Sequence, residues 1–203
     1  MDYGDGTRSV WAGEEAPHVP AKTPQETVAS NGWQECNPES VNSFTAVGYF
    51  FGRHLHKELN VPIGLVGSNW GGTRIEPWTP PAGFQAVAAL KQDYADKLDQ
   101  FPATNDAGRV NHQSPLALYN GMIHPLVPYA VRGAIWYQGE SNNGEGMLYH
   151  QKMKALIEGW RQVWNRKDMP FYFVQLAPYR YGRRDPTHLP AIWNLFFNRV
   201  FAQ

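Results

Sequence analysis

The sequence PIGLVGSNWGGTRIEPWT, residues 62–79, holds the pattern that is most informative about the architecture. It begins with the apolar run Ile63, Gly64, Leu65, Val66 and passes into a glycine-rich loop that contains Gly71 and Gly72. A short apolar run that ends at glycine is typical of a buried strand. We therefore predict a strand at 63–66, followed by a loop whose backbone can approach a ligand closely.

Similar apolar runs at 131–137 and 171–176 predict two more buried strands. Apolar residues recur at helical spacing over residues 43–60, 84–101, 147–164 and 189–202. Ser43 is expected to cap the first of these helices. Buried strands that alternate with helices indicate a parallel sheet covered on both faces. The predicted fold is therefore α/β, a three-layer α/β/α sandwich with a parallel sheet.

The 203 residues suffice for one domain. Residues 1–42 contain four prolines and no lasting periodicity, so we expect a loop-rich N-terminal part of the same domain. Residues 43–203 form its central part. In parallel sheets the site lies beyond the carboxyl ends of the strands, so the loops after Val66, Tyr137 and Leu176 are expected to converge.

Charge and composition narrow the classes of partner. Eighteen basic and eighteen acidic residues give a net charge of zero, which provides no field to attract nucleic acid or an anionic membrane. The single cysteine, Cys36, excludes an intrachain disulfide and any multi-cysteine metal site. No apolar run reaches the roughly 20 residues of a membrane span, and no export signal is visible at the N-terminus. Localisation and oligomeric state have no indicator in the sequence.

Two long segments and one helix carry a family resemblance. They are PIGLVGSNWGGTRIEPWT at 62–79, YNGMIHPLVPYAVRGAIWYQGESN at 119–142 and FTAVGYFFGRHLHKELN at 44–60. Together they resemble the sialate O-acetylesterase family, a carbohydrate-esterase branch of the SGNH (GDSL-like) hydrolases. The resemblance implies a flavodoxin-like fold and hydrolysis of acetyl esters on sialic acids or related sugars. It also implies a serine nucleophile, a histidine base and an oxyanion hole, with a small-molecule or glycan substrate and without metal or organic cofactor.

Two of the family's catalytic blocks have no counterpart in this sequence. The nucleophile of the family sits in a GQSNM-like block, and its histidine in an Asp-x-x-His-Pro-like block that follows a helix matching 189–202. Neither block is found where the resemblance implies it. We therefore expect an internal fragment of the esterase domain, incomplete at both ends. Members of the family are often exported from the cell.

The resemblance assigns the oxyanion hole to residues of two loops. Gly71 and Gly72 match the block whose glycine offers a backbone N–H to the oxyanion, and Gln138 matches the side-chain amide donor. A tight turn without a ligand and a buried amide that satisfies loop carbonyls are the structural alternatives. Glu140 and Asn142 are expected to support the second loop, Glu140 by capping the helix that follows.

Substrate binding is expected around the first loop. Trp70 and Trp78 flank it and could stack on a sugar face. Arg74 and Glu76 could contact the sugar or its carboxylate, although a mutual salt bridge on the rim of the site is favoured. Trp136, inside an apolar run, is expected in the core.

A second hypothesis uses only residues that are present. Gly139, Glu140 and Ser141 between a strand and a helix resemble the G-x-S-x-G nucleophile elbow, but Asn143 stands where the last glycine belongs. Ser141 would then be the nucleophile and His188, three residues after Asp185, the base. The Asp-x-x-His spacing arises readily by chance, so Asp185 and His188 are interpreted as solvated loop residues, and Ser141 as a structural or helix-capping hydroxyl. His54 and His56 face different sides of a helix, which makes a shared metal site improbable.

A third hypothesis is a sugar-binding domain that has lost its nucleophile. Such a domain should replace the core contribution of the missing strand, yet residues 1–42 show no apolar run of strand length. Truncation is therefore favoured, and it predicts an unpaired sheet edge and marginal stability.

Overall fold

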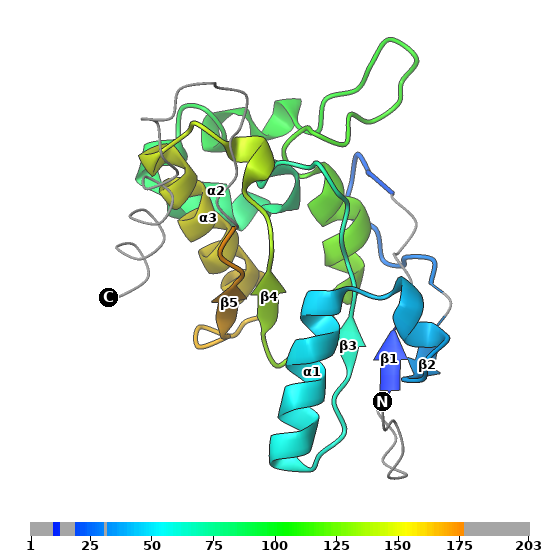
Figure 1. Ribbon diagram of the computed structural model, residues 1–203. Helices are drawn as coiled ribbons and strands as arrows, with labels where there is room; N and C mark the ends of the chain where they lie inside the picture. Colours follow the sequence, from blue (N-terminus) through cyan, green and yellow to red (C-terminus); the bar gives the residue numbers. More distant parts are fainter. Residues whose placement is uncertain (1–9, 13–18, 31, 177–203) are drawn as a thin grey trace, which may run out of the picture.

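The computed structural model describes residues 10–12, 19–30 and 32–176, and Figure 1 shows their arrangement. The strands are β1 (Val10–Ala12), β2 (Trp33–Glu35), β3 (Leu65–Val66), β4 (Ala134–Trp136) and β5 (Phe171–Phe173). The α-helices are α1 (Ala46–Leu59), α2 (Pro81–Ala86) and α3 (Met147–Val163). Shorter 3₁₀ or π turns are η1 (Ser40–Ser43), η2 (Glu76–Trp78), η3 (Ala88–Leu90), η4 (Ala95–Gln100), η5 (Tyr119–Ile123), η6 (His124–Leu126) and η7 (Glu140–Asn142).

Among the described residues, the strands form two small sheets. In one sheet β1 pairs in parallel with β3 and antiparallel with β2. In the other, β4 and β5 are parallel, with Ile135 opposite Tyr172. The predicted parallel pairing is confirmed for β4–β5. The strands β1 and β2 lie within residues 1–42, where we expected a loop-rich segment, so neither the parallel β1–β3 pairing nor the antiparallel β2 was predicted. The predicted strands are found, but each is shorter than its apolar run.

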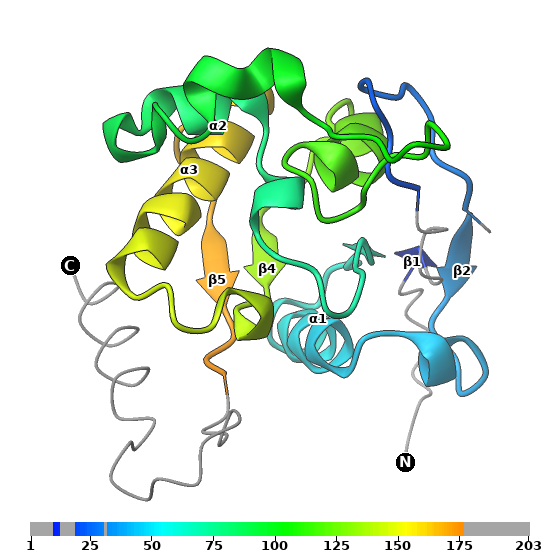
Figure 2. The same ribbon diagram turned by 90° about the horizontal axis from the view of Figure 1, so that it is seen from above.

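Helices cover both faces of β4 and β5, as Figure 2 shows from above. Side chains alternate along a strand, so neighbouring residues face opposite sides. Phe171 and Phe173 pack against the cluster that contains the apolar face of α3. Tyr172 points the other way and contacts Phe51 of α1, with ring centroids 5.6 Å apart. This alternation produces the layer order helix, sheet, helix and confirms the α/β prediction.

The larger core lies between α3 and the site loops. It contains Ile75, Trp78, Trp136, Met153 and Leu156 among its buried members. Trp136 is therefore in the core, as expected. A second, smaller core cluster joins α2 to α3 through Phe84, Val87, Leu90, Leu116 and Ala155.

The helix predicted over 43–60 is confirmed by α1, and the one over 147–164 by α3, whereas one cap residue and one long helix were predicted wrongly. The prediction over 147–164 matches α3 closely. The prediction that Ser43 caps the first helix is wrong, because Ser43 ends η1 and Thr45 is the N-cap of α1. The long helix at 84–101 is also wrong: α2 begins at Pro81 and stops before Val87, which is extended. This break lets Phe84 and Leu90 enter one buried cluster, so tertiary packing overrides the helical spacing.

Two further predictions concern segments near the two ends of the sequence, a helix at 189–202 and a loop-rich segment that includes residues 19–30. The helix predicted at 189–202 lies outside the described residues, as do Asp185 and His188. Residues 19–30 are irregular, as expected, and are attached to the core by hydrogen bonds such as that from Ala21 N to Ala117 O at 3.0 Å. Within the described ranges, no helix has the length and apolar character needed to cross a membrane.

Candidate functional site

The Gly71–Gly72 turn follows β3 and is exposed to solvent. Gly72 has a φ of +76°, a left-handed conformation that favours glycine. Its carbonyl accepts hydrogen bonds from Ser141 Oγ and Gln113 Nε2, both at 2.9 Å, which hold the turn in place. No acceptor among the described residues takes the backbone N–H of Gly71 or Gly72. The turn therefore offers two fixed N–H donors to solvent.

Gln138 follows β4 and contacts the same loop. Its Nε2 donates to Thr73 O at 3.1 Å and to Asn142 Oδ1 at 2.8 Å. Its Oε1 accepts a hydrogen bond from Tyr149 Oη at 2.9 Å, and burial raises the pKa of that phenol. Both amide hydrogens are thus engaged within the protein. To donate to an oxyanion, Gln138 would have to exchange one of these partners.

Asn142 connects the two loops and is fully buried. Its Oδ1 accepts from the backbone N–H of Ile75 at 3.0 Å as well as from Gln138. Its Nδ2 donates to Glu76 Oε2 and Glu145 Oε2, each at 3.1 Å. The side chain therefore satisfies its hydrogen-bonding capacity in one position, which fixes Gln138 relative to the loop after β3.

Four charged side chains surround this amide. Lys152 of α3 donates to Glu76 Oε1 at 2.6 Å and to Glu145 Oε2 at 2.8 Å. Arg74 Nη2 bonds Glu76 Oε1 at 3.0 Å and also pairs with Glu145. We call Arg74, Glu76, Glu145 and Lys152 the ionic cluster. It joins both site loops to α3.

The ionic cluster fixes the protonation of its members. Burial opposes ionisation of Glu76, but the hydrogen bonds from Lys152 and Asn142 and the charge of Lys152 outweigh it and lower its pKa to about 2. Burial likewise favours neutral Lys152, yet its bonds to Glu145 and Glu76 raise its pKa above the usual value. Both side chains are therefore charged at neutral pH, and each has its counter-ion within hydrogen-bond distance.

Lys152 and Glu145 were not predicted from the sequence. Lys152 is only 2% exposed, on the same helix face as the buried Tyr149, Met153 and Leu156. A lysine within an apolar helical stripe is the indication that could have revealed it, because a buried ammonium requires a partner.

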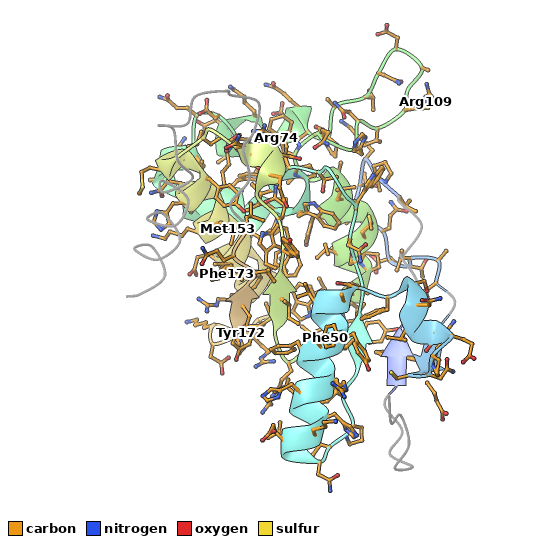
Figure 3. The ribbon with its side chains drawn as sticks, viewed as in Figure 1. Phe50, Arg74, Arg109, Met153, Tyr172 and Phe173 are labelled. Atoms are coloured by element: carbon orange, nitrogen blue, oxygen red, sulfur yellow. The ribbon has the colours of Figure 1, made fainter. Side chains whose placement is uncertain are left out.

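The residues predicted to bind substrate differ in burial and in contacts. Trp70 is half-buried and stacks on His112. Trp78 is 3% exposed and lies in the core, so the expectation that its ring stacks on a sugar is wrong. The expected salt bridge between Arg74 and Glu76 is confirmed, but Glu76 is buried and not on a rim. Figure 3 shows Arg74 beyond the carboxyl ends of β4 and β5, where the loops were expected to meet.

Glu140 and Ser141 follow Gln138 in the second site loop, and the capping role predicted for Glu140 is wrong. Glu140 is exposed and belongs to η7, whereas the N-cap of α3 is Gly146, so Glu140 does not cap that helix. Ser141 donates its hydroxyl to a backbone carbonyl. Within residues 10–12, 19–30 and 32–176, no group of three or more His, Cys, Asp or Glu is arranged to hold a metal ion.

In α/β folds, ligands bind beyond the carboxyl ends of the parallel strands, and backbone N–H donors there are suited to stabilise an oxyanion. The family described as carbohydrate esterase, sialic acid-specific acetylesterase matches residues 11–189, and the chain belongs to this family. Its relatives include a human sialate O-acetylesterase, 40% identical over 141 residues (66% of this chain and 25% of that protein). The mouse sialate O-acetylesterase is 34% identical over 173 residues, covering 73% of this chain and 32% of that protein.

A solved structure agrees with the sequence relatives. The crystal structure of XAC1771, a carbohydrate acetylesterase from Xanthomonas citri, superposes with a TM-score of 0.72 at 32% sequence identity. The match covers 96% of this chain and 40% of that structure. The chain thus spans between a quarter and two fifths of the length of these relatives.

Proposed function

We propose that this chain supplies the oxyanion hole and substrate-binding loops of a carbohydrate esterase that removes O-acetyl groups from sialic acid or related sugars. The observation that supports the proposal most directly is the exposed Gly71–Gly72 turn, whose two backbone N–H groups find no acceptor among the described residues. Preorganised N–H donors stabilise the tetrahedral oxyanion of ester hydrolysis, and one such donor contributes roughly 3 to 4 kcal/mol.

The mechanism requires rigid donors, because reorganisation during the reaction would cost transition-state stabilisation. The carbonyl of Gly72 is held by Ser141 and Gln113, and Gln138 holds the carbonyl of Thr73. We therefore assign Ser141 a positioning role. Gln138 is proposed as a third donor, which would turn one amide hydrogen from Thr73 O or Asn142 Oδ1 to the oxyanion.

The acyl-enzyme step is the finer part of the proposal. A serine hydroxyl attacks the acetyl carbonyl, a histidine accepts its proton, and the protonated histidine then returns a proton to the departing sugar oxygen. We place this serine and histidine outside the described residues, in agreement with the family pattern.

The test uses the complete protein that contains this sequence and measures acetate release from O-acetylated sialic acid. We expect Gln138→Ala to lower kcat by about 10²- to 10³-fold, the range for one lost donor. Ser141→Ala removes one of the two side-chain donors to Gly72 O, so we expect a smaller loss of kcat than in Gln138→Ala, whereas complete inactivation of a folded variant would favour Ser141 as the nucleophile. Gln162→Ala, at an exposed glutamine on α3, is the matched control and should leave kcat unchanged. An unchanged kcat in Gln138→Ala would remove Gln138 from the oxyanion hole.

A fluorophosphonate probe separates this proposal from its rivals, since it labels activated serines. We expect the 203-residue chain, shown to be folded by circular dichroism, to remain unlabelled, and the complete protein to be labelled outside this sequence. An adduct on Ser141 would support the nucleophile elbow instead. A complete protein that binds acetylated sugar without any label or acetate release would support a binding-only domain.

A further inference from the structure

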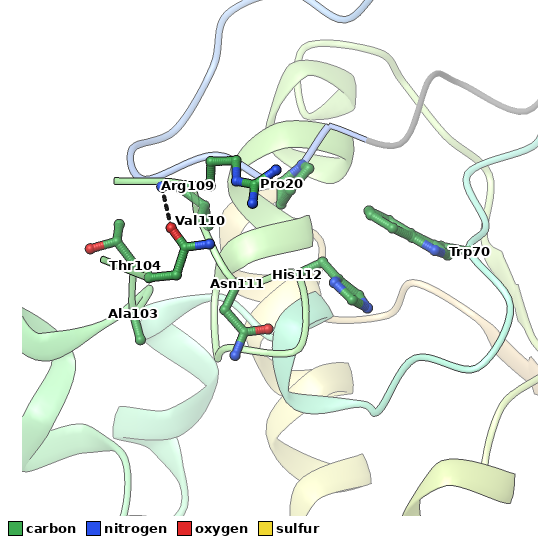
Figure 4. Close-up of a pocket in the computed structure, with 9 residues that line it drawn as sticks. Pro20, Trp70, Ala103, Thr104, Arg109, Val110, Asn111 and His112 are labelled. Carbon is green, nitrogen blue, oxygen red and sulfur yellow. Dashed lines mark hydrogen bonds between the residues drawn. The ribbon is translucent and has the colours of Figure 1, made fainter. Parts of the chain in front are cut away.

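The loop after β3 has an open side and a buried side. On the open side lies a cavity of about 460 Å³, with Trp70 and His112 along one wall and Arg109 across from them (Figure 4). Most residues of its lining belong to exposed loops, and no described side chain there indicates a particular ligand. On the buried side, Gln138 contacts the loop and is itself held by Tyr149 of α3. The buried partners of Gln138 therefore bear more directly on the reaction than the open cavity does.

Tyr149 contacts the oxygen end of the Gln138 carboxamide. Its side chain is 1% exposed and belongs to the larger core. Tyr149 Oη lies 2.9 Å from Gln138 Oε1 and 3.0 Å from the backbone oxygen of the same residue. Both oxygens can only accept hydrogen bonds, so the phenol must be the donor. The hydroxyl thus holds Gln138 by its side chain and by its backbone.

The nitrogen end of the same carboxamide faces two acceptors. Gln138 Nε2 donates to Thr73 O at 3.1 Å and to Asn142 Oδ1 at 2.8 Å. Asn142 Oδ1 also accepts from the backbone N–H of Ile75, so this end of the Asn142 amide is the oxygen. A half-turn of the Gln138 carboxamide would place its oxygen against two other oxygens. The contacts therefore permit one orientation, with the N–H groups toward the loop after β3 and the oxygen toward Tyr149.

The surroundings of Tyr149 keep its phenol protonated. Burial is the largest effect on its pKa and raises it, and the charges of Glu140, Glu145 and Glu76 act in the same direction. Trp136 opposes them as a donor near the phenol oxygen, although its buried indole N–H does not reach full hydrogen-bond geometry with any described acceptor. The pKa of Tyr149 remains above its usual value, so the hydroxyl donates its hydrogen at neutral and at mildly alkaline pH.

We propose that Tyr149 is a positioning residue of the oxyanion hole, whose hydroxyl holds Gln138 Oε1 and so directs the amide N–H groups toward the loop after β3. A hydrogen bond accepted by the amide oxygen also strengthens the amide N–H as a donor, because successive hydrogen bonds polarise one another. The inference rests on the proposed function in one respect, that Gln138 donates to the oxyanion. It goes further because it extends the catalytic machinery to a buried hydroxyl on α3.

Acetate release by the complete protein that contains this sequence tests the proposal. Tyr149→Phe removes the hydroxyl and keeps the ring in the core. We expect kcat to fall about 10- to 100-fold, the range for a buried hydrogen bond whose partner is left unpaired, with little change in KM, because Gln138 acts on the transition state. Tyr119→Phe is the matched control and should leave kcat unchanged. Tyr119 is also buried in the larger core, where burial raises its pKa to about 12, and Gln138 is not among its hydrogen-bond partners.

A double variant distinguishes action through Gln138 from a general effect on the core. In the Gln138→Ala background, Tyr149→Phe should lower kcat no further, since residues that act as one unit are not additive. Additive losses, an unchanged kcat in Tyr149→Phe, or an equal loss in Tyr119→Phe would overturn the proposal for Tyr149 alone. An unchanged kcat in Gln138→Ala would instead remove Gln138 from the oxyanion hole and would count against the proposed function.

Side-chain NMR of the complete protein provides a readout without catalysis. With ¹⁵N-labelled glutamine, the amide signals of Gln138 are identified by their loss in Gln138→Ala. Tyr149→Phe should shift these signals, and Tyr119→Phe should leave them in place. If Tyr149→Phe does not fold, fluorotyrosine in place of tyrosine, which makes the phenol a stronger donor, should shift them in the natural sequence. Unshifted signals would overturn the proposal. If the complete protein releases no acetate, the proposed function fails, and the shift still decides whether Tyr149 holds this amide.

Discussion

Buried charge determines the geometry of the candidate site at the scale of single residues. Glu76 and Lys152 are 5% and 2% exposed, and each would be unfavourable there alone. Their contact at 2.6 Å, together with the bonds to Asn142 and Glu145, satisfies both charges. Because the same carboxylates also accept hydrogen bonds from Asn142, the position of Gln138 depends on the ionic cluster. We propose that Arg74, Glu76, Glu145 and Lys152 act as positioning residues.

The first prediction concerns the pairing of Lys152. Lys152→Met removes the ammonium and leaves Glu76 buried without its closest counter-ion, so we expect a loss of about 3 to 5 kcal/mol in the free energy of unfolding. Urea denaturation of the chain measures it. Lys154→Met is the control, since Lys154 is exposed on the same helix and should change stability little. If Lys152→Met does not fold, the double variant Lys152→Met with Glu76→Gln should recover the fold. Equal stability of Lys152→Met and Lys154→Met would show that the ionic cluster does not stabilise the protein.

The second prediction concerns pH. The pKa of Glu76 falls from 4.5 to about 2 on folding, so the native state binds fewer protons than the unfolded state between these values. The stabilisation is complete above pH 4.5 and is lost as the pH falls toward 2. We expect a loss of about 3 kcal/mol over this window. Urea denaturation between pH 7 and pH 2.5 should show a steeper decline in the natural sequence than in Glu76→Gln, and parallel curves would refute the assignment.

At the scale of elements, the helices differ in how well their own sequence defines them. The apolar stripe of α3 survives in the structure because Met153, Leu156 and Trp160 enter the larger core, although Met147 and Leu148 in the first turn are exposed, and the prediction over 147–164 holds. The same spacing over 84–101 fails because Val87 is extended and directs Leu90 into the smaller cluster. The helical spacing of apolar residues in a sequence indicates which residues are buried. It does not distinguish a continuous helix from short turns around the same core.

Close packing of α2 on α3 leads to the third prediction. A Cβ added to Gly83 would lie 2.1 Å from the backbone oxygen of Ala155, and one added to Gly159 would lie 2.6 Å from Pro80 Cγ. Gly83→Ala therefore forces the helices apart, and we expect a loss of roughly 1 to 3 kcal/mol or more in unfolding free energy. Gln85→Ala, exposed on α2, is the control in the same denaturation experiment. A Gly83→Ala variant as stable as this control would show that the helices do not pack this closely.

At the scale of the whole molecule, the sequence predicts the class of fold better than the details of the site. The strand, loop and helix order around residues 62–79 and 131–164 follows from apolar runs and glycine, because both report on local burial. The ionic cluster does not follow from them, since Glu145 and Lys152 meet Glu76 only after β3, β4 and α3 have assembled. The family resemblance identified Gln138 and Asn142, but their mutual hydrogen bond depends on tertiary contacts.

The fourth prediction concerns how stability is distributed over the molecule. α3 buries seven residues, whereas α1 buries only Gly48 and Gly52 and leaves Phe50 62% exposed. The sheet of β3 and the sheet of β4 share no pairing among the described strands, and Phe51 of α1 contacts Tyr172 on the face of β5 that points away from the larger core. Segments with little buried apolar surface open at lower free energy than those in the core. We expect amide hydrogens of α1 to exchange at least about ten times faster than those of α3 in hydrogen–deuterium exchange at pH 7, because each 1.4 kcal/mol of local stability changes the opening constant tenfold.

The same experiment on the complete protein is the control, and protection of α1 should rise there if additional segments cover Phe50 and the edge of β3. Equal protection of α1 and α3 in the isolated chain, or a single cooperative unfolding transition at high temperature, would contradict the prediction that this chain is only marginally stable.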